Sequence, residues 1–140
     1  MTKARNKILV ERYFDACSRG DARAISDMYA PEGVHIARGN TLFSGTYSKE
    51  QIFEISGQVT GPFPEGLKFT IDNMIAEGDI VVAEVQSNGK HISGAYYHNE
   101  YAFIMKFQDG ALLEVKEYFD TEAATEVLCG GKKRALTDRY

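Results

Sequence analysis

The stretch ALLEVKEYFDT, residues 111–121, has the two-residue alternation of a half-buried β-strand. Successive side chains of a strand point to opposite faces, so four residues share one face: Leu113, Val115, Glu117 and Phe119. Three of the four are apolar, which indicates that this face packs on the core. Glu117 is the exception, and a carboxylate on a core face must be paired or have its pKa raised by desolvation. Such a group is suited to general acid/base chemistry near neutral pH.

The chain before this strand is predicted to form an antiparallel meander. The apolar-rich runs that read as strands lie at residues 67–76, 80–87 and 91–107. Asn88-Gly89 and Asp109-Gly110 are typical of hairpin turns. One face of the run 91–107 is expected to form a cavity wall that is aromatic with polar tips at one end, made of Asn99, Tyr101, Phe103, Met105 and Phe107.

Helical signals fill most of the first sixty residues. Apolar residues at helical spacing predict a helix over residues 2–19, which Gly20 ends. Asp21 is expected to cap a second, shorter helix, and Ser48 with Gln51 forms the capping box of a third.

The last elements complete an α+β domain. A short strand is expected at residues 34–37, followed by a loop, and a terminal helix at residues 121–128 that Asp120 caps. Helices followed by a meander predict that the helices cover one face of the sheet. The sequence thus predicts one domain over residues 1–128 and a tail over residues 129–140.

Composition excludes several classes of protein. A chain of 140 residues with 44% apolar and 26% charged residues is typical of one globular domain. Its net charge of −4 disfavours nucleic acid and anionic membranes as partners. Cys17 and Cys129 are too few for a disulfide framework, and three scattered histidines lack the spacing of metal ligands. We therefore expect a cytoplasmic protein that uses neither a metal nor another cofactor.

Five motifs occur in an order that carries a family resemblance. They are Tyr13-Phe14 through Arg19-Gly20-Asp21, Met28-Tyr29-Ala30-Pro31-Glu32-Gly33, Asn99-Glu100-Tyr101, Phe107-Gln108-Asp109-Gly110 and Glu117-Tyr118-Phe119-Asp120-Thr121. Together they resemble the SnoaL-like, or nuclear transport factor 2-like, superfamily, which includes ketosteroid isomerases and polyketide cyclases. The resemblance spans about residues 8–128 and implies a cone-shaped, curved antiparallel sheet wrapped around N-terminal helices. Because this fold hosts enzymes of several kinds and non-enzymes, it implies no single activity.

Some catalytic residues of these relatives have no counterpart here. A ketosteroid isomerase would place a tyrosine at Tyr13, which matches. It would also place its general-base aspartate at Ala37 and its oxyanion-hole acid at Phe103, and neither is present. The resemblance therefore does not imply steroid isomerisation by that mechanism.

At Glu117 this chain does have an acidic residue where several of these families have one. Epoxide hydrolases and SnoaL-type cyclases place an aspartate there, and phenazine-biosynthesis proteins of the A/B type place a glutamate that acts as acid and base. The hydrolases would also need an arginine and an aspartate at Glu84 and Gln86, which are absent. The cavity histidine of the cyclase corresponds to Phe103, so His35 is the candidate substitute if its strand turns it inward.

The candidate catalytic residues are therefore Glu117 and His35. The residues expected to bind a ligand are Tyr13, Glu84, Asn99, Tyr101, Phe103 and Phe119. Structural roles stay open for six of them. Glu117 could instead form an ion pair with Arg12 or Arg38, and Glu84 could face a subunit interface. His35 could be an ordinary strand residue, Tyr13 could pack in the core, and Asn99 and Tyr101 could hydrogen-bond each other.

Two functional interpretations follow. In the first, the protein binds a small organic carbonyl compound, and Glu117 moves a proton in a cofactor-free isomerisation, cyclisation or dehydration. In the second, it is a non-catalytic ligand-binding or dimerisation domain with a vestigial pocket. Apolar residues on both faces of the run 80–87, together with the resemblance, also predict a homodimer through the sheet.

Overall fold

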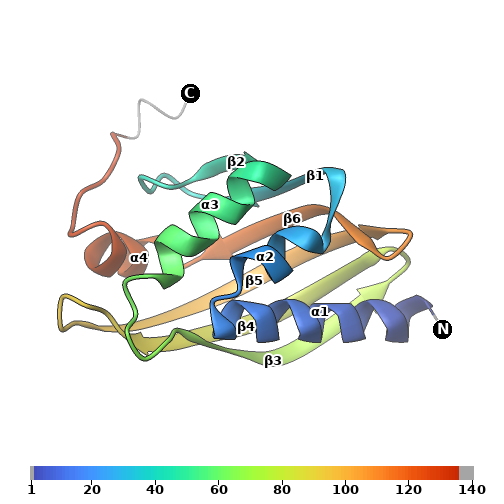
Figure 1. Cartoon of the computed structure of the whole chain (residues 1–140), viewed down its shortest axis with the longest axis horizontal. Coiled ribbons are helices and arrows are strands. Elements are labelled where there is room, and N and C mark those ends of the chain that lie inside the picture. The colour runs from blue at the N-terminus through green and yellow to red at the C-terminus, as the bar shows by residue number, and fades with distance from the viewer. Residues whose placement is uncertain (1, 136–140) are drawn as a thin grey trace.

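A curved six-stranded sheet carries helices on its concave side in the computed structural model, which describes residues 2–135 (Figure 1). The helices are α1 (Thr2–Arg19), α2 (Ala22–Asp27), α3 (Lys49–Thr60) and α4 (Thr121–Leu128). The strands are β1 (Tyr29–Ala37), β2 (Gly45–Ser48), β3 (Lys68–Glu77), β4 (Ile80–Lys90), β5 (Tyr96–Gln108) and β6 (Ala111–Phe119). The predicted α+β architecture is confirmed.

The sheet has the order β2-β1-β6-β5-β4-β3 and is mixed rather than purely antiparallel. β1 runs parallel to β6, and the other neighbouring strands are antiparallel. The prediction of an antiparallel sheet missed this one pairing, because local alternation carries no information on strands some eighty residues apart. The parallel register sets His35 opposite Val115 and Ala37 opposite Glu117.

Helix boundaries were predicted well because they rest on local chemistry. α1 and α4 match the predicted ranges. Asp21 and Asp120 cap α2 and α4 through their side chains, which accept hydrogen bonds from the backbone N–H of Ala24 and Ala123. The predicted capping box of α3 is complete on both sides.

The limits of the strands were predicted less well, because they depend on tertiary contacts. β1 begins at Tyr29 rather than at residue 34, with a register shift before Val34, and the short edge strand β2 lies in the predicted loop. Asn88-Gly89 lies within β4 instead of forming a turn. A Cβ at position 89 would approach the Gly66 carbonyl oxygen at 2.8 Å, so the glycine allows the preceding connection to pack there.

The facing of β6 was predicted correctly except at Leu112 and Leu113. Leu112 is fully buried, whereas Leu113 is only half-buried. A register shift against β5, between Lys106 and Phe107, changes the facing at this end of the strand. Beyond it, Val115, Glu117 and Phe119 share the inner face as predicted, with Val115 fully buried.

The core lies between the concave face of the sheet and α1. Val10 and Phe14 from α1 pack with Val81, Val85 and Met105 from the central strands. Ile75, Ile80 and Tyr118 are exposed large apolar side chains of β3, β4 and β6. The homodimer expected from the sheet stays a prediction. Within residues 2–135, no helix is both long and apolar enough to cross a membrane.

The end of the chain contacts the loop between β1 and β2. The Asn40 side-chain amide donates to the Arg134 carbonyl at 2.9 Å, and the Arg134 guanidinium donates to the Leu42 carbonyl at 3.2 Å. The predicted tail begins where α4 ends at Leu128. Its residues 136–140 lie outside the described part of the chain.

Candidate functional site

A cavity of about 110 Å³ lies between the concave face of the sheet and the helices. Its walls are mainly aromatic and aliphatic, and they include Tyr13, Phe14, Tyr101, Phe103 and Phe119. Glu117 contributes a carboxyl group to this wall, and His35 contributes an imidazole. An apolar hollow with a few converging polar groups is the usual form of a small-molecule site.

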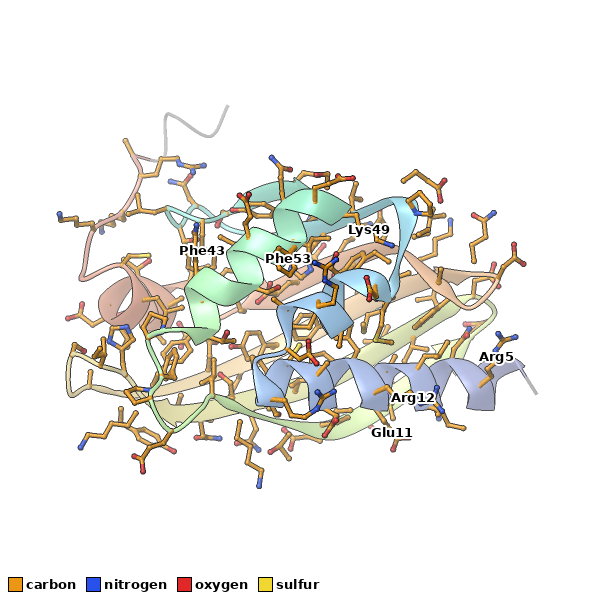
Figure 2. All side chains as sticks on the ribbon, viewed as in Figure 1. Arg5, Glu11, Arg12, Phe43, Lys49 and Phe53 are labelled. Carbon is orange, nitrogen blue, oxygen red and sulfur yellow. The ribbon has the colours of Figure 1, made fainter. Side chains whose placement is uncertain are left out.

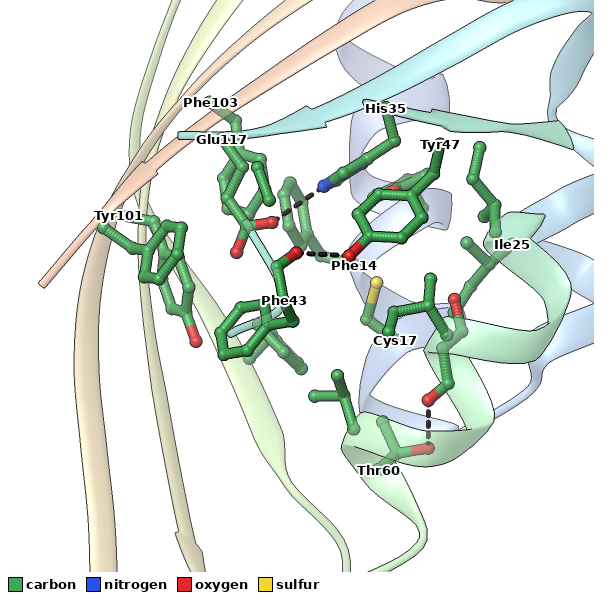
Figure 3. A pocket seen from close by; sticks show the side chains of 18 of the residues that line it. Phe14, Cys17, Ile25, His35, Phe43, Tyr47, Thr60, Tyr101, Phe103 and Glu117 are labelled. Atoms are coloured by element: carbon green, nitrogen blue, oxygen red, sulfur yellow. Dashed lines mark hydrogen bonds and ion pairs between the residues drawn. The ribbon is translucent and has the colours of Figure 1, made fainter. Parts of the chain in front are cut away.

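Glu117 and His35 are bonded to each other across the β1–β6 pair. The His35 Nε2 atom lies 2.7 Å from the Glu117 Oε1 atom, and both side chains are largely buried (Figure 3). Because β1 runs parallel to β6 with Ala37 opposite Glu117, His35 lies two residues away on the same face. The first strand therefore does turn His35 inward.

Two tyrosines continue the hydrogen bonds of this pair on the other side of the His35 ring. The His35 Nδ1 atom lies 2.9 Å from the Tyr29 hydroxyl, which lies 2.7 Å from the Tyr13 hydroxyl. Burial raises the pKa of Tyr13 and of Tyr29 well above the usual tyrosine value, so both hydroxyls keep their protons at neutral pH. In one consistent arrangement Tyr13 donates to Tyr29, Tyr29 to His35, and His35 to the Glu117 carboxylate. Both ring nitrogens of His35 are then occupied.

One carboxylate oxygen of Glu117 stays available to a ligand. Oε1 is bonded to His35, while Oε2 has no hydrogen-bond partner among residues 2–135 and lies on the cavity side (Figure 3). Beside Glu117 in the sheet lie Ala37 and Phe103, both apolar. Glu117 is therefore the group that can exchange a proton with a bound molecule, and His35 is placed to orient it.

The alternative ion pairs of Glu117 with arginine are not formed. The Arg38 guanidinium lies 5.6 Å from the ring centre of Tyr118, on the strand position that alternates with Glu117. Arg12 is an exposed residue of α1 (Figure 2). The partner of Glu117 is a histidine that the topology brings to it.

The part of the cavity wall that β5 forms carries tyrosine hydroxyls. The Tyr101 hydroxyl lies 2.8 Å from the Ser87 hydroxyl. Tyr97, which sequence reasoning missed, also lines the cavity, and burial raises its pKa to about 12. The Tyr97 hydroxyl accepts a hydrogen bond from Asn99 Nδ2 at 2.7 Å. This bond leaves the Tyr97 proton free to be donated.

Asn99 was predicted to bind ligand, but its side chain is fully used within the fold. Its amide donates to Tyr97 and to the Asp120 carbonyl, and its Oδ1 accepts from the backbone N–H of Glu100 and Asp120. It is 1% exposed and is not part of the cavity wall. Asn99 therefore links β5 to the start of α4 by hydrogen bonds, and it also donates a hydrogen bond to the Tyr97 hydroxyl.

Replacing Asn99 by Ala is expected to lower the free energy of unfolding by about 3 kcal/mol, because several buried polar groups lose their partner. Chemical denaturation measures this loss. Asn73→Ala is the matched control, since Asn73 is exposed on β3, and its effect is expected within about 0.5 kcal/mol. If Asn99→Ala left the stability unchanged and weakened ligand binding, Asn99 would be a ligand-binding residue rather than a structural one.

Glu84 was also predicted to bind ligand, and the structure places it on the other face of the sheet. It is exposed between the buried residues Ala83 and Val85, which point inward. Its carboxylate accepts a hydrogen bond from Asn73 Nδ2 at 3.2 Å on the outer surface. The like-charge pair with Glu117 does not form, because adjacent residues of a strand point to opposite faces.

The cavity mouth was not predicted. Phe43, in the loop before β2, stacks on Phe119 with ring centres 5.6 Å apart, and Tyr47 donates a hydrogen bond to the Phe43 carbonyl (Figure 3). Cys17 lines the cavity floor, and burial raises its pKa, so it remains a thiol. Tyr29 belongs to the motif that carries the family resemblance, but its place in the sequence gives no sign that it contacts His35.

Comparisons with known proteins agree with this architecture. A sequence model of the SnoaL-like domain family matches residues 10–115. No curated protein matches the chain.

Solved structures are similar in fold over nearly the whole chain. Bal32a, from a soil-derived mobile gene cassette, is 18% identical with a TM-score of 0.81, covering 91% of this chain and 99% of its own. A candidate SnoaL-like polyketide cyclase from Jannaschia is 21% identical with a TM-score of 0.73, covering 90% and 92%. TerC, co-crystallised with polyporic acid, is 19% identical with a TM-score of 0.73, covering 89% and 98%. At these identities the likeness shows the fold alone.

Proposed function

This chain belongs to the SnoaL-like domain family, and we propose that it binds a small organic carbonyl compound and moves a proton on it with Glu117. The observation that supports the proposal most is the free carboxylate oxygen of Glu117 on an apolar cavity, with His35 at 2.7 Å on the other oxygen. No cofactor is needed for this step, since a carboxylate that exchanges one proton suffices.

The chemistry follows from where the charges develop. The Glu117 carboxylate takes a proton from the carbon next to the carbonyl, and the electron pair of that C–H bond moves onto the carbonyl oxygen as an enolate. The carboxylic acid so formed returns the proton to the same carbon or to a conjugated one. Return to a different carbon gives an isomerisation. Attack of the enolate on a second carbonyl carbon of the same molecule gives a cyclisation, in which the C–O π bond opens to an alkoxide that takes the proton from Glu117.

The enolate oxygen needs a hydrogen-bond donor, because charge develops there in the transition state. Tyr97 and Tyr101 supply hydroxyls on the part of the wall that β5 forms, and burial raises the pKa of each. Asn99 donates to the Tyr97 oxygen and leaves the Tyr97 proton for the ligand, while the Tyr101 hydroxyl lies between Ser87 and Tyr97. The carbonyl oxygen of a substrate would point toward this part of the wall and its acidic carbon toward Glu117.

His35 acts through Glu117 in this scheme. Its Nε2 hydrogen bond holds the carboxylate orientation, and its Nδ1 bond to Tyr29 fixes the ring. In the other tautomer, in which Nδ1–H donates to Tyr29 and Nε2 accepts, His35 can also share the proton that Glu117 takes from the substrate, and it would then carry a positive charge next to the carboxylate. His35 was predicted to be a second proton carrier, and this remains part of the proposal.

Deuterium exchange tests the proposal directly. With cyclohexanone or acetophenone in D₂O, the protein is expected to speed deuterium entry at the carbon next to the carbonyl, followed by NMR. The carboxyl-carbon resonance of Glu117 is expected to shift when the ketone binds. Binding of the ketones without faster exchange would contradict the catalytic proposal and favour a ligand-binding module, the interpretation that the apolar Ala37 and Phe103 support.

A further inference from the structure

A second hollow adjoins the cavity on its outer side. This outer groove has a volume of about 340 Å³ and lies against α3, the loop before β2 and the end of α4. It shares five wall residues with the inner cavity: Phe43, Tyr47, Ile55, Val59 and Leu128. The two hollows therefore meet along one common wall.

The inner cavity alone is small for a substrate. At about 110 Å³ it is smaller than an engineered apolar cavity of about 150 Å³ that holds one benzene molecule. A compact head, such as a short branched group with its carbonyl, fills it when the carbon next to the carbonyl faces Glu117. The remainder of a larger molecule has to pass the common wall.

The common wall selects an apolar segment. Four of its five side chains are aliphatic or phenyl, and the hydroxyl of Tyr47 is already donated to the Phe43 carbonyl. Polar groups appear only at the far rim of the outer groove, where Gln58, His91 and Cys129 lie. A chain of methylenes or a flat aryl group suits this apolar wall, whereas a charged group there would lose its hydration without a partner.

The wall is also formed in advance. Phe43 is stacked on Phe119, and its loop is held by the Thr41 and Ser44 hydroxyls, 2.8 Å apart. The Arg134 guanidinium holds the same loop through the Leu42 carbonyl. A groove that needs no ordering on binding keeps more of the contact energy as affinity.

We propose that the natural substrate is elongated, with a compact carbonyl head in the inner cavity and an apolar tail in the outer groove. This rests on the proposed function for the position of the head. The tail adds binding energy remote from Glu117 and fixes which carbon faces the carboxylate.

Phenyl alkyl ketones of increasing chain length test this. We expect affinity to rise about two- to fourfold for each added methylene from acetophenone to hexanophenone, measured by calorimetry or by NMR titration. Val59→Trp fills the common wall, and because Val59 lines both hollows we expect it to weaken both ketones, hexanophenone more than acetophenone, so that the gain from chain length is lost. Because the chain contains no tryptophan, the new side chain also reports binding by fluorescence.

Phe53→Trp is the matched control. Phe53 lies on α3 but outside both hollows, 41% exposed beneath the Arg23 guanidinium (Figure 2). We expect this variant to keep the wild-type dependence on chain length, and its thermal unfolding shows whether a tryptophan in α3 is tolerated.

The outcomes separate the two proposals. Equal affinity for all chain lengths in the wild type, or an equal loss for both ketones in Val59→Trp, overturns the elongated substrate even if deuterium exchange occurs. Chain-length dependence that Val59→Trp removes, without any exchange, supports the groove and contradicts only the catalytic proposal. Failure of every ketone to bind contradicts both.

Discussion

Replacing Glu117 by Gln is expected to slow proton exchange on a bound ketone by about a hundredfold to ten-thousandfold, the usual contribution of a general acid/base. The amide has the size of the carboxyl group and can still bond to His35, but it cannot take a proton from carbon. Ketone affinity is expected to change little, because the walls of the cavity are unchanged. NMR exchange rates and titrations of the same ketone measure both quantities.

Two further variants show whether the effect belongs to this carboxylate. Glu114→Gln is the matched control, since Glu114 lies on the same strand beside Lys116, at 3.6 Å, and outside the cavity wall. Its exchange rate is expected to equal that of the wild type. His35→Gln is expected to slow exchange less than Glu117→Gln and to change the pH profile, as a positioning residue does. An exchange rate unchanged in Glu117→Gln would exclude Glu117 as the base.

Raising the pH above 10 is expected to unfold the protein over a narrow interval. Burial raises the pKa of Tyr97 to about 12 and holds those of Tyr13, Tyr29 and Tyr101 well above the usual value of 10. Below pH 10 these tyrosines are neutral in both the folded and unfolded states. Above it the unfolded chain releases protons that the folded chain keeps, so the free energy of unfolding falls as the pH rises.

The size of this effect follows from the number of buried hydroxyls. Each contributes a loss of about 1.4 kcal/mol per pH unit between its unfolded and folded pKa, so four together give about 5 kcal/mol per unit. A domain with an ordinary free energy of unfolding of about 5–15 kcal/mol loses all of it within a few pH units at this rate. Far-ultraviolet circular dichroism and tyrosinate absorbance, followed together, are expected to change in one step.

A single-residue change tests the origin of the slope. Tyr101→Phe keeps the ring that packs on Phe103 and removes one titrating hydroxyl. Its slope of stability against pH is expected to be shallower by about 1.4 kcal/mol per unit. Gradual tyrosine ionisation near pH 10 with unchanged circular dichroism would show that the buried tyrosines titrate within the folded protein.

The alkaline and catalytic predictions concern the same aromatic cluster. Tyr13 and Tyr29 stay protonated because they are buried, and only protonated hydroxyls can order the hydrogen bonds that end at Glu117. The burial that makes the fold sensitive to base thus keeps the site in one arrangement at neutral pH.

Much of the fold was readable from local patterns. Alternation along β6 placed Val115, Glu117 and Phe119 on the inner face, and side-chain caps located the starts of α2, α3 and α4. These patterns depend on residues close in the sequence, so they can be interpreted without knowledge of the tertiary structure.

The same patterns misplaced features that depend on distant contacts. Glu84 lies in a strand whose two faces are both largely apolar, so periodicity could not show that it points outward. Asn99 was correctly placed on the inner face. Only the structure shows that its side chain already makes four hydrogen bonds within the protein, three of them to Tyr97 and Asp120.

The sequence by itself determined an α+β domain with an acidic side chain at position 117 on a buried face. Only the tertiary structure decided that β1 runs parallel beside β6, which sets the imidazole of His35 against that carboxylate from 82 residues away. The reason is physical: periodicity shows which side chains share a face, whereas strand neighbours are chosen by the burial and hydrogen bonding of the whole chain.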